Sequence, residues 1–321
     1  MIAPGPNTTS SDWAGLSWSS WFPLDASLET YRELVAKKSG FYRIRADNLS
    51  SLIYIGQTGR SLFERVRSLR RGVYRNLDDP PWNDPHTAAP LLWSYRHENG
   101  LLYECSVAVA NNDTPIRQCQ EDALLYLHRI EHGGSTLCNH GRLHPYWTRP
   151  TNRNRGITTC RRNKKINYPS LPPAIGNNNY DASDWLGLTW ENPDSLAIGE
   201  LSNPGVYRII NDGSLNYIGE SMNLNSRLTT HSRDNRFNGC KYSIHLMPDT
   251  LPHQLKERET DLIGAYFLKM GEPPRFQYKS RHWARWHYAF QLNPLVALVG
   301  ALSHKPRTLL NSVVSLLLSQ S

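Results

Sequence analysis

The alternation of apolar and polar residues predicts strands at matching places in the two halves of the chain. The clearest alternating stretches are Tyr103 to Val109 and Tyr242 to Met247. Ahead of each stretch lie two short apolar runs that contain tyrosine, separated by a gap that suits a hairpin. These runs are Gly40 to Ile44 and Tyr54 to Gly56 in the first half, and Gly205 to Ile209 and Tyr217 to Gly219 in the second.

A helix is predicted after each alternating strand. Asp113-Thr-Pro115 and Asp249-Thr-Leu-Pro252 offer capping side chains, with proline at or near the first helical turn. Gly133 and Gly271 suit the helix C-caps. Each half therefore has the order strand, strand, helix, strand, helix, which predicts an α+β fold with a small, about three-stranded antiparallel sheet flanked by helices.

The two halves also share sequence, which indicates an internal duplication. Ser11-Asp-Trp13-Ala-Gly15-Leu-Ser-Trp18 recurs as Ser183-Asp-Trp185-Leu-Gly187-Leu-Thr-Trp190, ahead of the tyrosine runs in both halves. We expect these tryptophan pairs to pin each N-terminal segment to its domain. The predicted domains are residues 1–150 and 181–293, with a connector at 151–180 and an amphipathic tail at 294–321.

The connector is basic. Thr148 to Pro173 holds seven Arg or Lys residues, Lys164 and Lys165 among them, and has no apolar periodicity. Two interpretations stay open, a solvated linker and an arm that follows phosphates.

The charge of the whole chain favours a polyanionic partner. Its 321 residues carry a net charge of +8 with a pI near 9.2, which suits either nucleic acid or an anionic membrane. No apolar run approaches the roughly 20 residues that span a bilayer, and no secretory signal is evident. The five cysteines are irregularly spaced and are read as reduced thiols. We therefore expect a cytoplasmic protein that does not enter a membrane.

The repeated triplets resemble the GIY-YIG endonuclease family. They read Gly40-Phe-Tyr42 with Tyr54-Ile-Gly56, and Gly205-Val-Tyr207 with Tyr217-Ile-Gly219. The family pattern continues with a Ser or Thr, a Leu and a helical Arg. In this chain the three positions are Thr58, Leu62 and Arg65 in the first half, and Ser221, Leu224 and Arg227 in the second.

The resemblance extends to a histidine, a glutamate and an amide. His231 follows Arg227 by four residues on the same helix face, whereas the first half has Leu69 there. The glutamate that would hold a metal ion is Glu259, which lies in an apolar stripe, and its counterpart is Glu121. Asn139 and Gln277 stand eighteen residues beyond these glutamates, where the family often has an amide.

What the resemblance implies is hydrolysis of a phosphodiester with one divalent ion per site, Mg²⁺ or Mn²⁺. Tyr42 or Tyr207 would position or deprotonate the water, with help from Tyr54 or Tyr217. Arg65 or Arg227 would bind the phosphate. An unperturbed phenol is a poor base at neutral pH, so a nearby Arg or metal ion must favour its ionised form, or His231 must take the proton. A single strand tyrosine usually packs in a core, and it is the repeated, ordered set that favours a site.

The first half carries a long insertion, Arg70 to Leu92, that contains His86. His86 is a candidate for the missing histidine, and a loop that enters a DNA groove is the alternative. A zinc site is a weaker hypothesis, because the spacings of His132, Cys138, His140, His144 and Cys160 fit no standard pattern. The stretch with Arg281, Trp283 and Arg285 interleaves charge with aromatic rings and is a candidate DNA contact.

These observations predict a metal-dependent endonuclease that acts on double-stranded DNA. Two sites in one chain would form an internal pseudo-dimer, so that a monomer suffices to cut both strands. A restriction or mobile-element nuclease fits this arrangement. The alternatives are a nickase in which the second half alone cuts, and a DNA-binding protein without catalysis.

Overall fold

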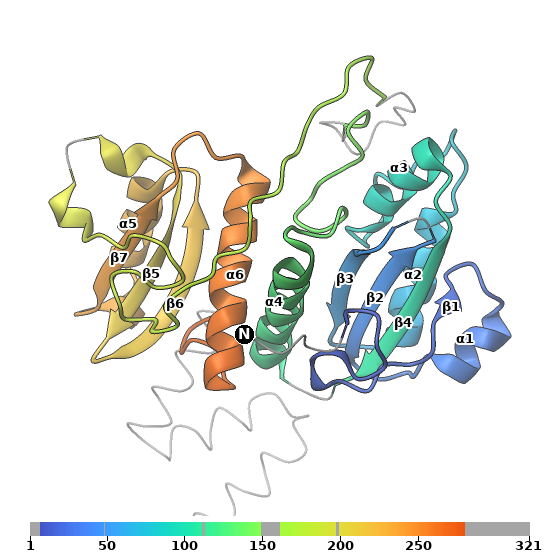
Figure 1. Ribbon diagram of the computed structural model, residues 1–321, viewed down its shortest axis with the longest axis horizontal. Coiled ribbons are helices and arrows are strands. Elements are labelled where there is room, and N and C mark those ends of the chain that lie inside the picture. Colours follow the sequence, from blue (N-terminus) through green and yellow to red (C-terminus); the bar gives the residue numbers. More distant parts are fainter. Residues whose placement is uncertain (1–6, 48, 111–112, 149–160, 197–198, 280–321) are drawn as a thin grey trace, which may run out of the picture. The chain divides into compact units, whose positions relative to one another are not determined.

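The computed structural model describes residues 7–47, 49–110, 113–148, 161–196 and 199–279. The described residues up to Gln277 belong to one compact unit, and Tyr278 begins a second unit of which Tyr278 and Lys279 are described. Within the described ranges the fold is α+β, with two antiparallel sheets and six α-helices (Figure 1). This agrees with the predicted mixed class.

The first half contains a four-stranded sheet in the order β1-β4-β2-β3. The expected three strands are present, and a fourth, β1, pairs through Phe22 with Cys105 of β4. The insertion does not remain a loop throughout, because its last residues begin α3. The elements are β1 (Phe22–Pro23), α1 (Leu28–Leu34), β2 (Gly40–Ala46), β3 (Leu52–Thr58), α2 (Leu62–Val73), α3 (Ala89–Asn99), β4 (Tyr103–Val109) and α4 (Thr114–His132).

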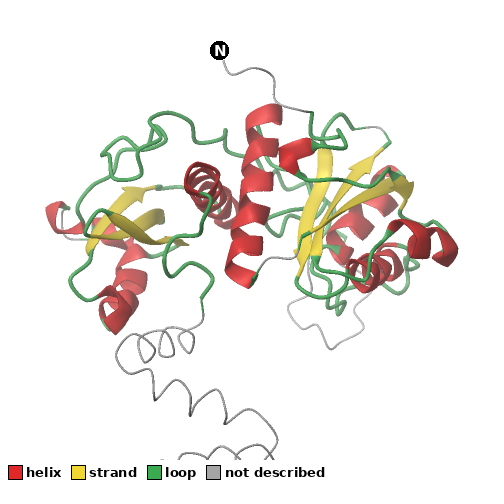
Figure 2. Cartoon of the chain, turned by 90° about the horizontal axis from the view of Figure 1, so that it is seen from below, coloured by secondary structure: helices red, strands yellow, loops and turns green. Residues whose placement is uncertain are grey.

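The second half has the predicted strand, strand, helix, strand, helix order and a three-stranded sheet in the order β6-β5-β7. Its elements are β5 (Gly205–Asn211), β6 (Ser214–Ser221), α5 (Leu224–Ser232), β7 (Lys241–Leu246) and α6 (Pro252–Met270). Short 3₁₀ turns lie at Trp13–Gly15, Pro193–Ser195, Glu200–Ser202 and Asn235–Phe237. Helices lie against both sheets (Figure 2).

The ends of the two long helices follow the predicted caps at three of four points. Asp113 Oδ1 accepts from the Ile116 amide at 3.1 Å at the start of α4. Gly133 and Gly271 end α4 and α6 in the left-handed conformation that glycine favours. The prediction for Asp249 is wrong, because Leu251 precedes α6 and its amide donates to Gln254 Oε1 at 3.0 Å.

The repeated tryptophans enclose a buried arginine from the first strand of each tyrosine hairpin. The Arg43 guanidinium lies 4.3 Å from the centre of the Trp18 ring, and that of Arg208 lies 4.4 Å from Trp190. Arg43 also donates to the Ser10 carbonyl at 2.8 Å, while Arg208 donates to that of Ala182 at 3.0 Å. Cation–π contact and hydrogen bonds thus hold each N-terminal segment against its sheet, as the repeat predicted.

Helices α4 and α6 pack against each other through residues that are counterparts in the repeat. Aligning Glu121 with Glu259 makes Asp122 the counterpart of Thr260, whose hydroxyl donates to Asp122 Oδ1 at 3.3 Å. Tyr126 is likewise the counterpart of Gly264, where an added Cβ would lie 2.7 Å from Tyr126 Cβ. Contacts between counterparts are the mark of an approximate two-fold relation.

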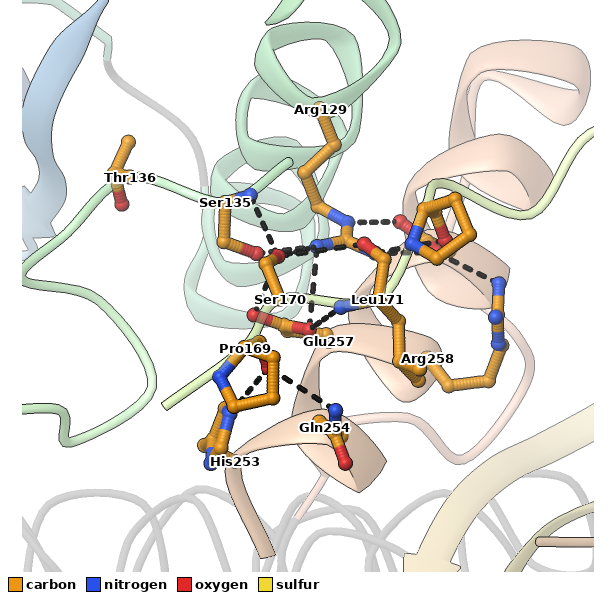
Figure 3. A network of polar contacts seen from close by, with 12 residues as sticks. Arg129, Ser135, Thr136, Pro169, Ser170, Leu171, His253, Gln254, Glu257 and Arg258 are labelled. Atoms are coloured by element: carbon orange, nitrogen blue, oxygen red, sulfur yellow. Dashed lines mark hydrogen bonds and ion pairs between the residues drawn. The ribbon is translucent and has the colours of Figure 1, made fainter. Parts of the chain in front are cut away.

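A buried ionic network joins the two helices to the connector (Figure 3). Arg129 of α4 donates from Nε to Asp261 of α6 at 2.6 Å and lies 3.5 Å from Glu257. The Glu257 carboxylate accepts from Ser170 Oγ at 2.9 Å and from the Leu171 amide at 2.8 Å. This part of the predicted linker is therefore fixed between α4 and α6, whereas Lys164 and Lys165 are exposed.

Among the described residues no helix is long and apolar enough to cross a membrane. The four described cysteines, Cys105, Cys119, Cys138 and Cys240, are free thiols.

Candidate functional site

Each half places the first-triplet tyrosine opposite the glycine of the second triplet. Strand pairing sets Tyr42 against Gly56 and Tyr207 against Gly219. A Cβ on Gly56 would lie 2.5 Å from the Tyr42 hydroxyl, and one on Gly219 would lie 2.3 Å from that of Tyr207. Both distances are far below carbon–oxygen contact, so the space above each glycine is what admits the hydroxyl group.

A histidine imidazole contacts this hydroxyl in both halves. Tyr207 Oη lies 2.8 Å from His231 Nε2, and Tyr42 Oη lies 2.9 Å from His86 Nε2. His231 comes from α5, whereas His86 comes from the loop before α3. Leu69, at the helix position that corresponds to His231, is fully buried in the core instead. The insertion therefore supplies the histidine beside the Tyr42 hydroxyl, because the helix position that corresponds to His231 is occupied by Leu69.

The predicted arginines stand beside the same tyrosines. Arg227 Nε donates to the Tyr207 hydroxyl at 3.1 Å. In the first half the Arg65 charge lowers the pKa of Tyr42, while Arg65 Nε is buried without a hydrogen-bond acceptor among the described residues. Arg227 is exposed and Arg65 is half-buried. Both guanidinium groups can thus offer N–H donors to an anion beside the tyrosine.

Burial keeps the tyrosines neutral in the free protein. It raises the pKa of Tyr42 to about 12 even though Arg65 acts in the opposite direction. The pKa of Tyr207 is raised for the same reason, and Arg227 opposes that shift too. The second-triplet tyrosines, Tyr54 and Tyr217, also have raised pKa values because of burial. The arginines therefore lower the pKa values of Tyr42 and Tyr207, as predicted, but burial has the larger effect and both tyrosines stay neutral.

The two glutamates are half-buried and have raised pKa values. Burial raises the pKa of Glu121 to about 7, against the opposing effects of Arg65, a Gln57 backbone hydrogen bond and Arg117. Burial followed by repulsion from Glu220 and Asp122 raises the pKa of Glu259 to about 8. Each carboxylate would gain from a nearby cation.

The donor set around each glutamate fits Mg²⁺ or Mn²⁺ better than zinc. The described residues hold no group of three or more His, Cys, Asp or Glu side chains that could bind a metal ion together. Mg²⁺ is commonly bound through one or two carboxylates, and waters and substrate phosphate oxygens complete its shell. Structural zinc needs four protein ligands, so the zinc hypothesis has no support among the described histidines and cysteines.

The two amides hold the strand that carries the second triplet. Asn139 accepts from the Ile55 amide at 3.0 Å and donates to the Ile55 carbonyl at 2.8 Å. Gln277 Oε1 accepts from the Ile218 amide at 3.0 Å. Both side chains are buried, so they position the backbone between Tyr54 and Gly56 and between Tyr217 and Gly219.

Two residues near the glutamates differ between the sites, and of these the sequence indicates only Arg117, as a possible partner of Glu121 one helical turn away. Arg117 of α4 donates from Nε to Gln57 Oε1 at 2.8 Å, and its charge lowers the pKa of Glu121. The counterparts of Gln57 and Arg117 in the second half are Glu220 and Leu255. Aligning the two halves could have revealed this contact, because the residues at both of its positions differ between the halves.

The candidate DNA contacts Arg281, Trp283 and Arg285 lie outside the described residues.

Comparison of the chain with known protein families, with curated proteins and with solved structures finds no match.

Proposed function

We propose that the chain is a metal-dependent endonuclease that hydrolyses phosphodiester bonds in double-stranded DNA, with one GIY-YIG-like site in each half. The observation that carries the proposal is the repeated contact between a buried tyrosine hydroxyl and a histidine Nε2, at 2.9 Å and 2.8 Å. An arginine and a half-buried glutamate accompany the contact in both halves. Packing alone does not require this combination twice.

In the second site, Arg227 would hold a phosphate oxygen through N–H groups that Tyr207 leaves free, because its exposed side chain is open to a ligand. The Tyr207 hydroxyl would hydrogen-bond the attacking water. His231 Nε2 lies 2.8 Å from that hydroxyl and would accept a proton relayed through it. The base would then be a histidine with the phenol as relay, since the phenol itself has a raised pKa.

Glu121 and Glu259 would hold the divalent ion. A bound ion would supply positive charge beside the leaving oxygen, the part of the transition state where negative charge develops. The raised pKa values of both carboxyl groups mean that loading the site releases a proton near neutral pH.

The packing of α4 on α6 supports an internal pseudo-dimer. The glutamates are each one residue away from the Asp122–Thr260 contact. An approximate two-fold axis near this contact relates the two sites in the way that a duplex dyad relates its antiparallel strands. A single chain would then cut both strands, and the net charge of +8 would favour binding to the duplex.

One observation favours the nickase alternative. Both histidines are buried, but Arg227 is exposed while Arg65 is half-buried, so the arginine of the second site is the more accessible to a phosphate. In this alternative the first half grips the duplex and the second half alone cuts.

The test is a cleavage assay on supercoiled plasmid with Mg²⁺, together with DNA binding measured by fluorescence anisotropy. We expect the double variant Glu121→Gln, Glu259→Gln to bind DNA as the parent does but to cut nothing. Absence of cleavage of any DNA or RNA by the parent protein, with Mg²⁺ and with Mn²⁺, would contradict the proposal and support a binding protein.

A further inference from the structure

The insertion of the first half fixes His86 in one orientation. The His86 amide donates to Asp84 Oδ1 at 2.8 Å, and the His86 carbonyl accepts from the Ala89 amide at 2.9 Å. Asp84 in turn lies close against α2, where a Cβ on Gly72 would lie 2.6 Å from Asp84 Oδ2. The imidazole is fully buried. His86 is therefore held by its own loop and by α2.

The contacts of the two ring nitrogens determine where the proton lies. The Ala88 amide donates to His86 Nδ1 at 3.3 Å, so Nδ1 is an acceptor and carries no hydrogen. In a neutral imidazole the hydrogen is then on Nε2, which faces the Tyr42 hydroxyl at 2.9 Å. Burial and then the Arg65 charge lower the pKa of His86 to about 3, against a smaller opposing effect of the His86 backbone, so the ring stays neutral.

We propose that His86 is a positioning residue of the first site, a neutral imidazole whose Nε2–H donates to Tyr42 Oη. Such a donor holds the phenol oxygen in place and stabilises a phenolate, while it cannot accept a proton at Nε2. The inference rests on the proposed function and deepens it. In the first site Tyr42 must then be ionised when DNA and metal ion are bound, so that its phenolate takes the proton of the attacking water itself, whereas in the second site His231 is the proposed acceptor.

The groups that face His86 agree with this role. Tyr42 lies 5.8 Å and Tyr54 6.3 Å away between ring centres, and Arg65 adds a positive charge nearby. A positive charge beside the ring disfavours an imidazolium, and the phenols carry no charge in the free protein. The site thus favours a histidine that donates and does not titrate.

The experiment measures nicking by the first site alone, in protein that carries Glu259→Gln. His86→Gln keeps an N–H donor near the position of Nε2, whereas His86→Leu fills the volume without one. We expect His86→Leu to lower the nicking rate by about 10- to 100-fold, the range for a lost hydrogen bond to a charged group. We expect His86→Gln to restore most of that loss and to leave the pH profile of nicking unchanged.

A spectroscopic readout tests the hydrogen bond whether or not the protein cuts DNA. In ¹⁵N NMR we expect His86 to show a protonated Nε2 and an unprotonated Nδ1 from pH 5 to pH 8. A protonated Nδ1, an imidazolium, or equal loss of activity in His86→Gln and His86→Leu would overturn the proposal. If the parent protein proves inactive, the same spectrum still tests the Nε2–H donation from His86 to Tyr42, while the proposed function fails on its own assay.

Discussion

Gly219→Ala is expected to disable the second site through the position of Tyr207. An alanine Cβ at 219 would lie 2.3 Å from the tyrosine hydroxyl and 2.4 Å from Cζ. Non-bonded carbon atoms are most stable about 3.5 Å or more from their neighbours, so the ring must withdraw by about 1 Å. The substitution changes none of the groups proposed to act in catalysis.

The withdrawal would break two hydrogen bonds at once. Tyr207 Oη lies 2.8 Å from His231 Nε2 and 3.1 Å from Arg227 Nε, and neither contact survives a 1 Å shift away from its partner. A misplacement of about 1 Å costs a reaction on the order of 100-fold in rate. Crowding in the core should also lower the free energy of unfolding by about 1–3 kcal/mol.

The assay is single-turnover nicking of supercoiled plasmid in protein that carries Glu121→Gln, so that the second site acts alone. Gly134→Ala is the control, because a Cβ there would meet Ser170 at an ordinary 3.5 Å. Circular dichroism and urea unfolding would establish that both variants are folded. If folded Gly219→Ala nicks at the rate of its parent, the position of the Tyr207 hydroxyl does not govern the reaction.

Three further predictions follow from the interface and the glutamates. Arg129→Leu removes one of two arginines from each of two buried carboxylates, since Glu257 keeps Arg142 and Asp261 keeps Arg258. The loss of its hydrogen bonds to charged groups should cost about 3 kcal/mol in urea unfolding, against about 0–1 kcal/mol for Arg75→Leu in the exposed pair with Asp79. A loss for Arg129→Leu no larger than that for Arg75→Leu would refute the role given to the network. Burial raises the pKa of folded Glu259 to about 8, so the unfolded chain binds fewer protons there than the folded one, and this contribution to stability is lost as pH rises towards 8. In metal-free buffer, Glu259→Gln should therefore gain stability relative to the parent between pH 5 and 8, and a constant difference across that range would contradict the shift. Finally, the Cα atoms of Glu121 and Glu259 lie within about 17 Å of each other, because each glutamate is next to a residue of the Asp122–Thr260 contact. Mapping the ends of the linear products should therefore place the two cuts within about one helical turn of DNA. A wider spacing would exclude the pseudo-dimer.

The sequence was sufficient for the elements that local patterns specify. Alternation gave β4 with the bounds Tyr103–Val109, and the predicted second strand lies one residue from β7. Asp113 and the two C-cap glycines were found because caps act within one turn of chain. Asp249 failed because a nearby glutamine, Gln254, serves the helix start instead.

Long-range contacts explain what the sequence did not reveal. Nothing in the periodicity of the insertion or of the residues after it indicates that residues 89–99 form a helix, or that His86 reaches Tyr42 across 44 residues. The anchoring of the connector depends on Glu257 and Asp261, whose partners are distant in the sequence. Such pairings depend on tertiary packing. A single sequence shows the polar residues within an apolar stripe, but it does not show which distant residues pair with them.

The central claim is that one chain carries two cutting sites, and the division of labour between Glu121 and Glu259 tests it most directly. Supercoiled plasmid would be incubated with Mg²⁺ and either the parent, Glu121→Gln or Glu259→Gln, and the nicked and linear forms followed over time. We predict that the parent gives linear DNA without lasting nicked circles, and that each single variant stops at the nicked form. Linear product from a single variant at the parent's rate would contradict the account.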